Sequence, residues 1–451
     1  MTKVAIISLG CARNDVDSEE LAAKLKADGL VLEKDPEKAD AVLVNTCGFI
    51  EQAKKDSIDT LLEANELKNS SGVKAVVAVG CMAERYGDEL AKALPEADAI
   101  LGFDDYPDIA QKVSRILGGE KLAAPKVQDR RLLLPVTPVE RKQAKKFNHR
   151  TRLDSGPSAP LKIASGCDRR CTFCAIPRFR GSYISRSIEE IVDEAHWLVS
   201  EGVKEVFLVS ENTTSFGKDL GDLRSLEKLL KELSKIDDLA WIRLSYLQPA
   251  EMRPSLFDAI LDTEKVVPYF DLSFQHASES VLRRMKRFGS KDAFLEMTEQ
   301  IRSKNPKAGI RSNFIVGFPG EMEAEFEELS DFLVKAELDS IGVFEYANED
   351  NTAAFEFEDQ ISDSLKRERF NHLKSLADEL IDQKASSRIG EKSQVLIEGL
   401  EDGKHFGRSL HQGPDIDGTT HLPNGKYKIG QLVNISMQDN FGADLIAKEV
   451  K

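Results

Sequence analysis

Apolar and polar positions alternate in a regular order through the first hundred residues. Three short runs of apolar, mostly β-branched residues have the length of buried strands, at 3–9, 41–45 and 74–79. Each run is followed by a stretch whose apolar positions have helical spacing, at 18–27, 57–67 and 83–93. Strands and helices in this alternating order predict a parallel sheet with right-handed crossovers.

A second alternating series occupies the middle of the chain. Six strand-like runs are expected at 161–163, 206–209, 240–244, 270–274, 310–316 and 340–344. Helical stretches lie between them, for example at 188–200, 226–235 and 323–336. Six strand–helix repeats predict an incomplete β/α barrel, in which functional residues lie at the carboxyl ends of the strands.

The pattern changes after a helix that is expected to end near residue 385. Short β-type runs follow at 394–397, 406–409 and 432–437, and frequent glycines separate them, which predicts a small antiparallel barrel. The predicted fold is therefore α/β with an N-terminal parallel-sheet domain (1–117), a linker (118–158), a (β/α)6 domain (159–386) and a C-terminal β-barrel (387–451).

The linker is basic, and we expect its charges to lie on the surface and to be solvated. The cations on which this expectation rests are Arg130, Arg131, Arg141, Lys142, Lys145, Lys146, Arg150 and Arg152.

Composition narrows the class of protein. Hydrophobic residues make up 41% of the 451 residues and charged residues 31%, a normal globular mixture. No apolar run approaches the ~20 residues of a membrane span, and the N-terminus shows no signal-peptide pattern, so we expect a cytoplasmic protein without a membrane partner. The net charge of −15 favours a neutral or basic partner over nucleic acid, although acidity also serves solubility alone.

The six cysteines divide into two groups of three. The cytosol is reducing, so three disulfides are not expected. Cys11, Cys47 and Cys81 each fall within two residues of the end of a predicted strand. The carboxyl ends of parallel strands share one edge of a sheet, so these three thiols are predicted to converge there.

The other three cysteines, Cys167, Cys171 and Cys174, are closely spaced after the first strand of the second domain. Three thiolates on one loop can hold three corners of a cubane iron–sulfur cluster and leave the fourth iron open. That iron can bind the amino and carboxylate groups of S-adenosylmethionine. The alternative is a zinc site lacking one ligand, but the nearest histidines, His149 and His196, are distant in sequence.

This cysteine spacing resembles that of the radical S-adenosylmethionine superfamily. The resemblance implies that Phe173 lies near the adenine, that Glu211 orients the methionine amino group, and that the strand ending at Gly317 backs the adenine. It also implies that Gln275 and Arg311 contact the cofactor. On the residues alone, Glu211 also fits a polar strand-end loop, and the Gly-Phe-Pro-Gly stretch at 317–320 also fits a simple turn.

With Cys11, Cys47 and Cys81 added, the chain resembles the methylthiotransferases over nearly its whole length. That family combines a domain carrying a second cluster, a radical domain and a TRAM barrel. The resemblance implies two [4Fe-4S] clusters and S-adenosyl-L-methionine as cofactors. It further implies that the N-terminal cluster carries a sulfur that becomes methylated, and that the radical site abstracts hydrogen from the substrate.

Two types within the family compete. The MiaB type modifies adenosine in transfer RNA, and the RimO type modifies the β-carbon of an aspartate in a small-subunit ribosomal protein. Four stretches look like the RimO type: Ser8-Leu9-Gly10-Cys11-Ala12-Arg13-Asn14, Asn45-Thr46-Cys47-Gly48-Phe49, Gln275-His276-Ala277-Ser278, and Gly407-Arg408-Ser409 followed by Gly413-Pro414-Asp415-Ile416-Asp417-Gly418. We therefore expect a ribosomal-protein substrate, with transfer RNA as the alternative, and an electron donor of the flavodoxin or ferredoxin type.

The charge of the C-terminal barrel gives an independent indication. Residues 388–451 hold eight Lys or Arg and nine Asp or Glu, whereas a barrel that grips RNA is expected to carry a surplus of positive charge. Nucleic-acid binding is therefore not favoured. Asp415 and Asp417, in a Gly-Pro-Asp-Ile-Asp-Gly loop, are expected either to pair with Lys or Arg of a basic partner or merely to shape turns.

Overall fold

The computed structural model describes residues 1–133, 150–414 and 416–450. It divides into two compact units. Unit 1 comprises Met1–Ser155, Ser165–Asp168 and Ala175–Ile184. Unit 2 comprises Gly156–Ala164, Arg169–Cys174 and Ser185–Lys451. The chain passes between the units more than once around the predicted radical-site cysteines.

Unit 1 is built on a five-stranded parallel sheet, which confirms the expectation for the N-terminal domain. The strands are β1 (Lys3–Ser8), β2 (Val31–Leu32), β3 (Ala41–Thr46), β4 (Ala75–Gly80) and β5 (Ala99–Ile100), in the order β2-β1-β3-β4-β5. Every neighbouring pair is parallel. This order reverses direction between β1 and β3, the position at which open α/β sheets bind ligands.

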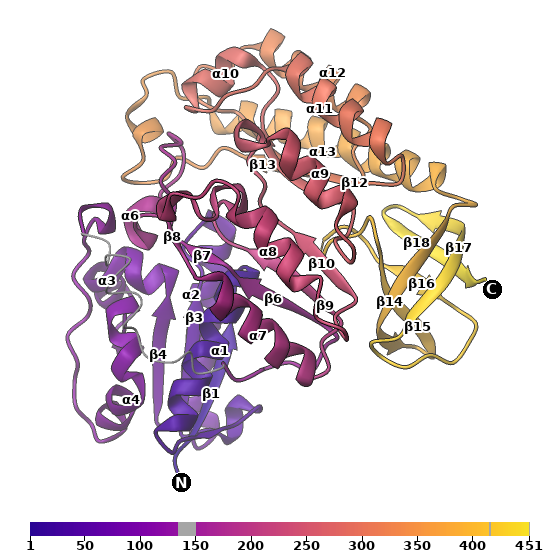
Figure 1. Cartoon of the computed structure of the whole chain (residues 1–451). Coiled ribbons are helices and arrows are strands. Elements are labelled where there is room, and N and C mark those ends of the chain that lie inside the picture. The colour runs from indigo at the N-terminus through magenta and orange to yellow at the C-terminus, as the bar shows by residue number, and fades with distance from the viewer. Residues whose placement is uncertain (134–149, 415, 451) are drawn as a thin grey trace. The chain divides into compact units, whose positions relative to one another are not determined.

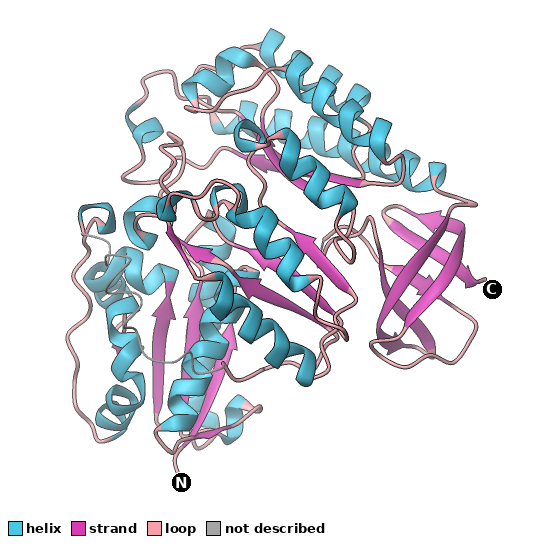
Figure 2. Cartoon of the chain, viewed as in Figure 1, coloured by secondary structure: helices cyan, strands magenta, loops and turns pink. Residues whose placement is uncertain are grey.

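Helices cover both faces of this sheet (Figure 2). Apolar side chains of α1 (Ala12–Ala27) and α4 (Ile109–Leu117) pack on one face, and those of α2 (Glu51–Ser70) and α3 (Cys81–Ala93) pack on the other. The central strands are buried on both sides, which is why they have continuous apolar sequences. Helix α1 begins six residues earlier than predicted, because buried polar residues in its first turns interrupt the apolar spacing.

Unit 2 contains the predicted incomplete barrel of six parallel strands. One ladder joins β6 (Ser158–Lys162), β9 (Glu205–Val209) and β10 (Trp241–Leu244), and a second joins β11 (Tyr269–Gln275), β12 (Gly309–Val316) and β13 (Ser340–Glu345). Two isolated bridges between Ile242 and Val266 and between Leu247 and Leu272 connect the ladders. The strands therefore follow one another around the barrel in chain order.

The helices of this barrel alternate with its strands in the chain. They are α7 (Ile188–Ser200), α8 (Ser225–Leu233), α9 (Pro254–Asp262), α11 (Lys291–Lys304), α12 (Glu323–Ala336) and α13 (Asp363–Ser387), with a shorter α10 (Glu279–Arg284) after β11. The Phe274 ring on β11 stacks on Phe294 of α11 at 4.2 Å between centroids and meets Phe332 of α12 edge-on. Aromatic packing between strands and helices thus holds this side of the barrel together.

The C-terminal segment forms a closed five-stranded barrel, coloured yellow in Figure 1. Its strands are β14 (Lys392–Glu401), β15 (Lys404–Ser409), β16 (Thr420–Leu422), β17 (Leu432–Phe441) and β18 (Asp444–Glu449). The sequence pattern indicated only β14, β15 and β17, because β16 is three residues long and β18 is half exposed. All pairs are antiparallel except β16 with β18, which is parallel.

Buried ion pairs join this barrel to the amino ends of the strands within unit 2. The carboxylate of Glu205 on β9 lies between the guanidinium groups of Arg243 on β10 and Arg408 on β15, and Arg408 also pairs with Glu398 at 2.6 Å. Two arginines beside Glu205 outweigh its burial and lower its pKa to about 2. The small barrel therefore packs on the β/α barrel through buried ion pairs between charged residues.

Two expectations about surface charge are corrected by the structure. Asp417 is 5% exposed and accepts hydrogen bonds from the Tyr269 hydroxyl and the Gly413 amide, so the predicted pairing with an external partner is wrong. Asp415 lies outside the described residues. In the linker, the guanidinium of Arg150 is buried against Glu19, so its charge is paired within the protein rather than solvated.

The charge of Arg130 in the linker is also paired within the protein, by ion pairs to Glu84 at 2.5 Å and Asp104 at 2.7 Å. Arg152 is also buried beside Glu19, at 3.7 Å, and pairs with Asp154. Arg131 is half exposed and pairs with Asp129. The expectations for Arg141, Lys142, Lys145 and Lys146 fall outside the described residues. Within the described part of the chain, no helix is long and apolar enough to cross a membrane.

Candidate iron–sulfur sites

The three N-terminal cysteines follow three adjacent strands of the unit 1 sheet. Cys11 precedes α1 after β1, Cys47 directly follows β3, and Cys81 is the first residue of α3 after β4. All three are free thiols, and each lies close enough to the others for their charges to interact. The predicted convergence at the carboxyl edge of the sheet is therefore confirmed.

Two glycines allow the cysteine loops to approach one another. A Cβ at Gly10, where φ is +99°, would lie 2.8 Å from the Cβ and 2.9 Å from the sulfur of Cys47. A Cβ at Gly48 would lie 2.9 Å from the Cα of Met82. Side chains at these positions would push the loops apart, so the small residues beside the cysteines belong to the construction of the site.

The side chain of Asn14 connects the three strand ends. Its amide nitrogen donates to the backbone oxygen of Leu9 at 2.8 Å and of Thr46 at 3.1 Å. Its amide oxygen lies 3.4 Å from the sulfur of Cys81. Asn14 is fully buried and was not identified from the sequence, although it lies three residues after Cys11 in the same motif.

The environments of the three thiols differ. Burial opposes ionisation of Cys11, but the cation of Arg13, the backbone N–H of Asn14 and the cation of Arg180 outweigh it and lower the pKa of this thiol. Burial raises the pKa of Cys47 and raises that of Cys81 to about 12. Metal binding to Cys47 and Cys81 must therefore displace their protons.

The loop that carries the other three cysteines lies between β7 (Ala164–Ser165) and α6 (Ile176–Arg180). In unit 1, the Cys167 amide donates to the Gly181 carbonyl at 3.0 Å. In unit 2, the backbone amide of Thr172 donates to the Met285 carbonyl, and its hydroxyl donates to the Arg284 carbonyl at 2.9 Å. The loop is therefore anchored on both sides by hydrogen bonds.

A guanidinium group contacts one ligand of this second site. Nη1 of Arg287 lies 3.6 Å from the sulfur of Cys171, and its Nη2 donates to the Gln248 side chain and the Ser273 carbonyl. Arg287 follows α10 and is 116 residues from Cys171 in the chain, so spacing alone could not have identified it. Its partners orient one N–H toward the thiol.

Glu251 forms a second support for the same loop. Its carboxylate accepts hydrogen bonds from Ser215 at 2.6 Å and Asn212 at 3.0 Å, and it pairs with Arg169 at 2.6 Å. Arg169 lies between Cys167 and Cys171, and Asn212 and Ser215 belong to the loop after β9. The carboxylate thus ties the cysteine loop to the strand end predicted to bind the cofactor.

Four of the five predicted cofactor contacts have positions consistent with one edge of the barrel. Partly exposed Phe173 lies in the cysteine loop, Glu211 follows β9, Gln275 ends β11, and Gly317 follows β12. Gln275 has a φ of 73°, and Gly317 has the same φ with its amide bound to Glu321. These residues lie at the carboxyl ends of the strands, where the barrel is expected to act.

Arg311 lies near the opposite end of β12. Its Nε is 3.5 Å from the Asp417 carboxylate, and the charge of Asp271 on β11 also acts on it. Burial opposes the charge of Arg311, but these carboxylates outweigh it and raise its pKa. Arg311 therefore joins the two barrels and is not among the residues proposed to contact the cofactor.

The two sets of cysteines supply the soft thiolate donors that iron–sulfur clusters take. Among the described residues, no three His, Cys, Asp or Glu side chains gather closely enough to hold one ion. A cluster attaches each cysteine to a separate iron, and soft thiolates are the ligands that such clusters take. Two sets of three cysteines fit two clusters, each with one open iron.

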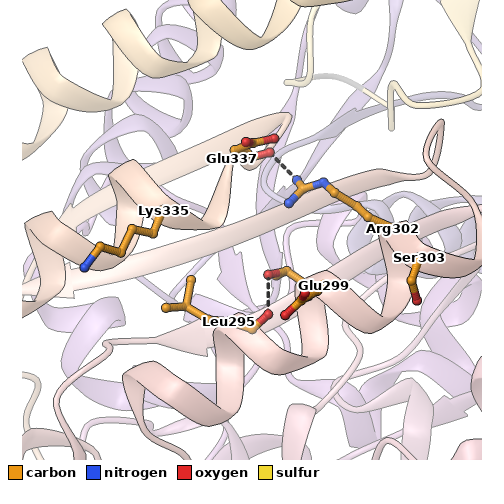
Figure 3. Close-up of a pocket in the computed structure, with 7 residues that line it drawn as sticks. Leu295, Glu299, Arg302, Ser303, Lys335 and Glu337 are labelled. Atoms are coloured by element: carbon orange, nitrogen blue, oxygen red, sulfur yellow. Dashed lines mark hydrogen bonds between the residues drawn. The ribbon is translucent and has the colours of Figure 1, made fainter.

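An open cavity of about 560 Å³ lies elsewhere in unit 2 (Figure 3). It is lined by residues of α11 and α12 and of the turn after α12: Leu295, Thr298, Glu299, Arg302, Ser303, Lys335 and Glu337. Arg302 there binds the backbone oxygens of Ala336 and Glu337. None of the predicted site residues lines this cavity.

A parallel sheet with three cysteines at its edge, a six-stranded β/α barrel with a three-cysteine loop, and a small closed barrel together define a class of protein: a radical S-adenosylmethionine enzyme with a second cysteine site. Comparison with protein families agrees. Residues 3–102 match the Uncharacterized protein family UPF0004, residues 161–333 the Radical SAM superfamily, and residues 389–450 the TRAM domain.

Similar proteins identify the family within this class of radical enzymes. The chain is 55% identical over 469 residues to "Ribosomal protein uS12 methylthiotransferase RimO" of Cutibacterium acnes, covering 99% of this chain and 97% of that protein. It is 54% identical to the protein of the same name from Nocardioides sp., with the same coverage. The chain belongs to the RimO family of radical S-adenosylmethionine methylthiotransferases.

The fold is also found in a solved structure. The radical S-adenosylmethionine methyltransferase TsrM from Kitasatospora setae, with cobalamin and a [4Fe-4S] cluster bound, gives a TM-score of 0.54 at 14% identity, covering 76% of this chain and 75% of that one. This likeness concerns the fold. The cofactors of the family to which the chain belongs are two [4Fe-4S] clusters and S-adenosyl-L-methionine.

Proposed function

We propose that the chain adds a methylthio group to the β-carbon of an aspartate in the small-subunit ribosomal protein uS12. The observation that carries this proposal is the name shared by relatives that are 50–55% identical over 99% of the chain. The near-balanced charge of residues 388–451 supports a protein substrate over transfer RNA, because RNA binding is driven by surplus positive charge.

In this proposal, Cys11, Cys47 and Cys81 hold one cluster, and Cys167, Cys171 and Cys174 hold the cluster that binds S-adenosylmethionine. When bound, these groups supply the one-electron chemistry, the hydrogen abstraction and the methylthio group that no acid–base side chain supplies. An unactivated carbon does not lose a proton to ordinary bases, so the reaction needs such groups.

In this proposal, the chain's own residues bind the clusters and S-adenosylmethionine and orient them. The Thr172 and Glu251 contacts hold the cysteine loop against the strand ends, and Arg287 donates toward the Cys171 sulfur. Phe173, Glu211, Gln275 and Gly317 are proposed to contact S-adenosylmethionine at those ends. In unit 1, Asn14 holds the loops that bring Cys11, Cys47 and Cys81 together.

The proposal also covers the electron donor, the location and the domains of the protein. A low-potential donor of the flavodoxin or ferredoxin type would supply electrons, and action on a ribosomal protein goes with a cytoplasmic location. The proposed domains are 1–117, 159–386 and 387–451, joined by the linker at 118–158.

The test is anaerobic reconstitution of three full-length proteins: wild type, Cys11/Cys47/Cys81→Ala and Cys167/Cys171/Cys174→Ala. Wild type should bind about eight irons and each triple variant about four. Wild type is then reduced with S-adenosylmethionine and offered uS12 or transfer RNA, and mass spectrometry follows the methylthio group.

Modification of uS12 alone is expected. The Cys11/Cys47/Cys81→Ala variant should still release 5′-deoxyadenosine, because its radical site is intact, but should transfer no methylthio group. Modification of transfer RNA in place of uS12 would overturn the substrate. Loss of all iron from either triple variant would overturn the assignment of two independent sites.

A further inference from the structure

Arg180, at the end of α6, lies against the N-terminal cysteine site within unit 1. Its Nη2 is 3.0 Å from the sulfur of Cys81 and 3.0 Å from the amide oxygen of Asn14. The sequence predicted Cys81 as a cluster ligand, but it predicted no role for Arg180. Only six residues separate it from Cys174, yet it belongs to the other cysteine site.

The guanidinium of Arg180 is held in one orientation. Its Nη1 pairs with Asp17 at 2.8 Å, and its Cζ lies 4.7 Å from the centre of the Phe103 ring. The side chain is only 7% exposed. Because Asp17 occupies one nitrogen, the other nitrogen is directed at the Cys81 sulfur and Asn14, and little freedom remains to turn away.

A hydrogen bond from a cation to a ligand sulfur has a defined electrostatic effect. Reduction of an iron–sulfur cluster adds a negative charge, and an N–H donor at a ligand sulfur stabilises that charge. Groups that contact ligands rather than metal also fix the ligand's orientation. Burial strengthens both effects, because no water screens the interaction.

We propose that Arg180 is a positioning residue for the cluster on Cys11, Cys47 and Cys81, where it orients Cys81 and raises the cluster's reduction potential. This rests on the assignment of that cluster in the proposed function. The segment that follows the radical-site cysteines thereby sets a property of the other cluster, although it contributes no ligand to it.

The experiment uses the full-length Cys167/Cys171/Cys174→Ala protein, which retains one cluster. Arg180→Gln, Arg180→Lys and the control Arg178→Gln are introduced into it. Arg178 lies on the same helix but is 36% exposed, and its contact is with Asp129 at 3.9 Å. Each protein is reconstituted, its iron is counted, and its midpoint potential is measured by a redox titration followed by electron paramagnetic resonance.

The Arg180→Gln variant should have a more negative potential than the parent, and Arg178→Gln should match the parent. Arg180→Lys should fall between parent and Arg180→Gln, because Lys keeps the charge but cannot donate to Asp17 and Cys81 as a fork. If Arg180→Gln binds no iron, the midpoint potential of Arg180→Lys tests the proposal instead. A potential of Arg180→Lys equal to that of the parent then refutes it.

Equal shifts in Arg180→Gln and Arg178→Gln, or no shift in either, would also refute the role of Arg180. A parent that binds no iron would instead contradict the assignment of the N-terminal cluster. The two failures are therefore distinguishable.

Discussion

The hydroxyl of Tyr269, on strand β11, donates a hydrogen bond to the carboxylate of Asp417 in the C-terminal barrel. Arg311 lies 3.5 Å from the other oxygen of the same carboxylate. Asp417 thus compensates a buried hydroxyl and a buried cation of the β/α barrel. Its role is to hold the two barrels of unit 2 together, and it cannot also bind an external cation.

Replacement of Asp417 by Ala should destabilise the protein. The substitution removes the acceptor of the buried Tyr269 hydroxyl and leaves Arg311 with the charge of Asp271 alone. Breaking a buried ion pair costs about 3–5 kcal/mol. The measurement is the denaturant midpoint of unfolding. The control is Asp439→Ala, an exposed acidic residue on β17, for which a change within about 0.5 kcal/mol is expected. Equal effects of the two substitutions would contradict the buried role of Asp417.

Glu205 predicts a specific dependence of stability on pH. Its folded-state pKa of about 2 lies below the usual value of 4.5, so its carboxylate stabilises the fold above about pH 4.5 and this contribution is lost as pH falls toward 2. Thermal unfolding midpoints between about pH 6 and about pH 3 should fall more steeply in wild type than in Glu205→Gln.

The Glu205→Gln variant should also be less stable at neutral pH, because Arg243 and Arg408 then share no anion between them. Parallel pH profiles for the two proteins would show that Glu205 does not act as a carboxylate. The comparison isolates one group, since every other titrating residue is common to both.

Arg287 predicts a defect confined to the radical site. Arg287→Gln removes the N–H donor at Cys171 and should lower the release of 5′-deoxyadenosine about 10–100-fold, the usual effect of losing a partner of a metal ligand. The matched control is Arg283→Gln, an exposed residue of α10 that forms an ion pair with exposed Glu279. Similar loss in both variants would contradict a role through Cys171.

The sequence patterns identified the features that depend on local order. Strands of unit 1 buried on both faces have continuous apolar runs, and the cysteines at their ends could be assigned to one edge because parallel strands align. The spacing of Cys167, Cys171 and Cys174 likewise predicted their shared loop. These features need no knowledge of distant partners.

Features that depend on distant contacts were missed or misread. Asp417 lies in a loop sequence typical of exposed turns, but its partner Tyr269 is 148 residues away. The buried role of Asn14 depends on the carbonyls of Leu9 and Thr46, to which its side-chain amide donates, and Thr46 lies 32 residues further along the chain. The role of Arg180 likewise depends on its contact with Cys81, which lies 99 residues earlier in the chain.

Gly48 offers the sharpest test of how the N-terminal site is built. In a Gly48→Ala variant, the new Cβ would lie 2.9 Å from Cα and 3.0 Å from the amide nitrogen of Met82, and 3.3 Å from the Cys81 carbonyl carbon. These are backbone atoms of a helix start, so they cannot rotate away as a flexible side chain would. The loops of Cys47 and Cys81 must then separate.

Gly48→Ala should therefore reduce the bound iron from about eight to about four per chain while 5′-deoxyadenosine release continues. The matched control is Gly72→Ala, whose new Cβ meets no atom within 4 Å. Iron content and deoxyadenosine are measured on the same reconstituted samples. Full iron loading of Gly48→Ala would show that close approach of these two loops is not required for the cluster, whereas loss of iron from both glycine variants would point to a general folding defect.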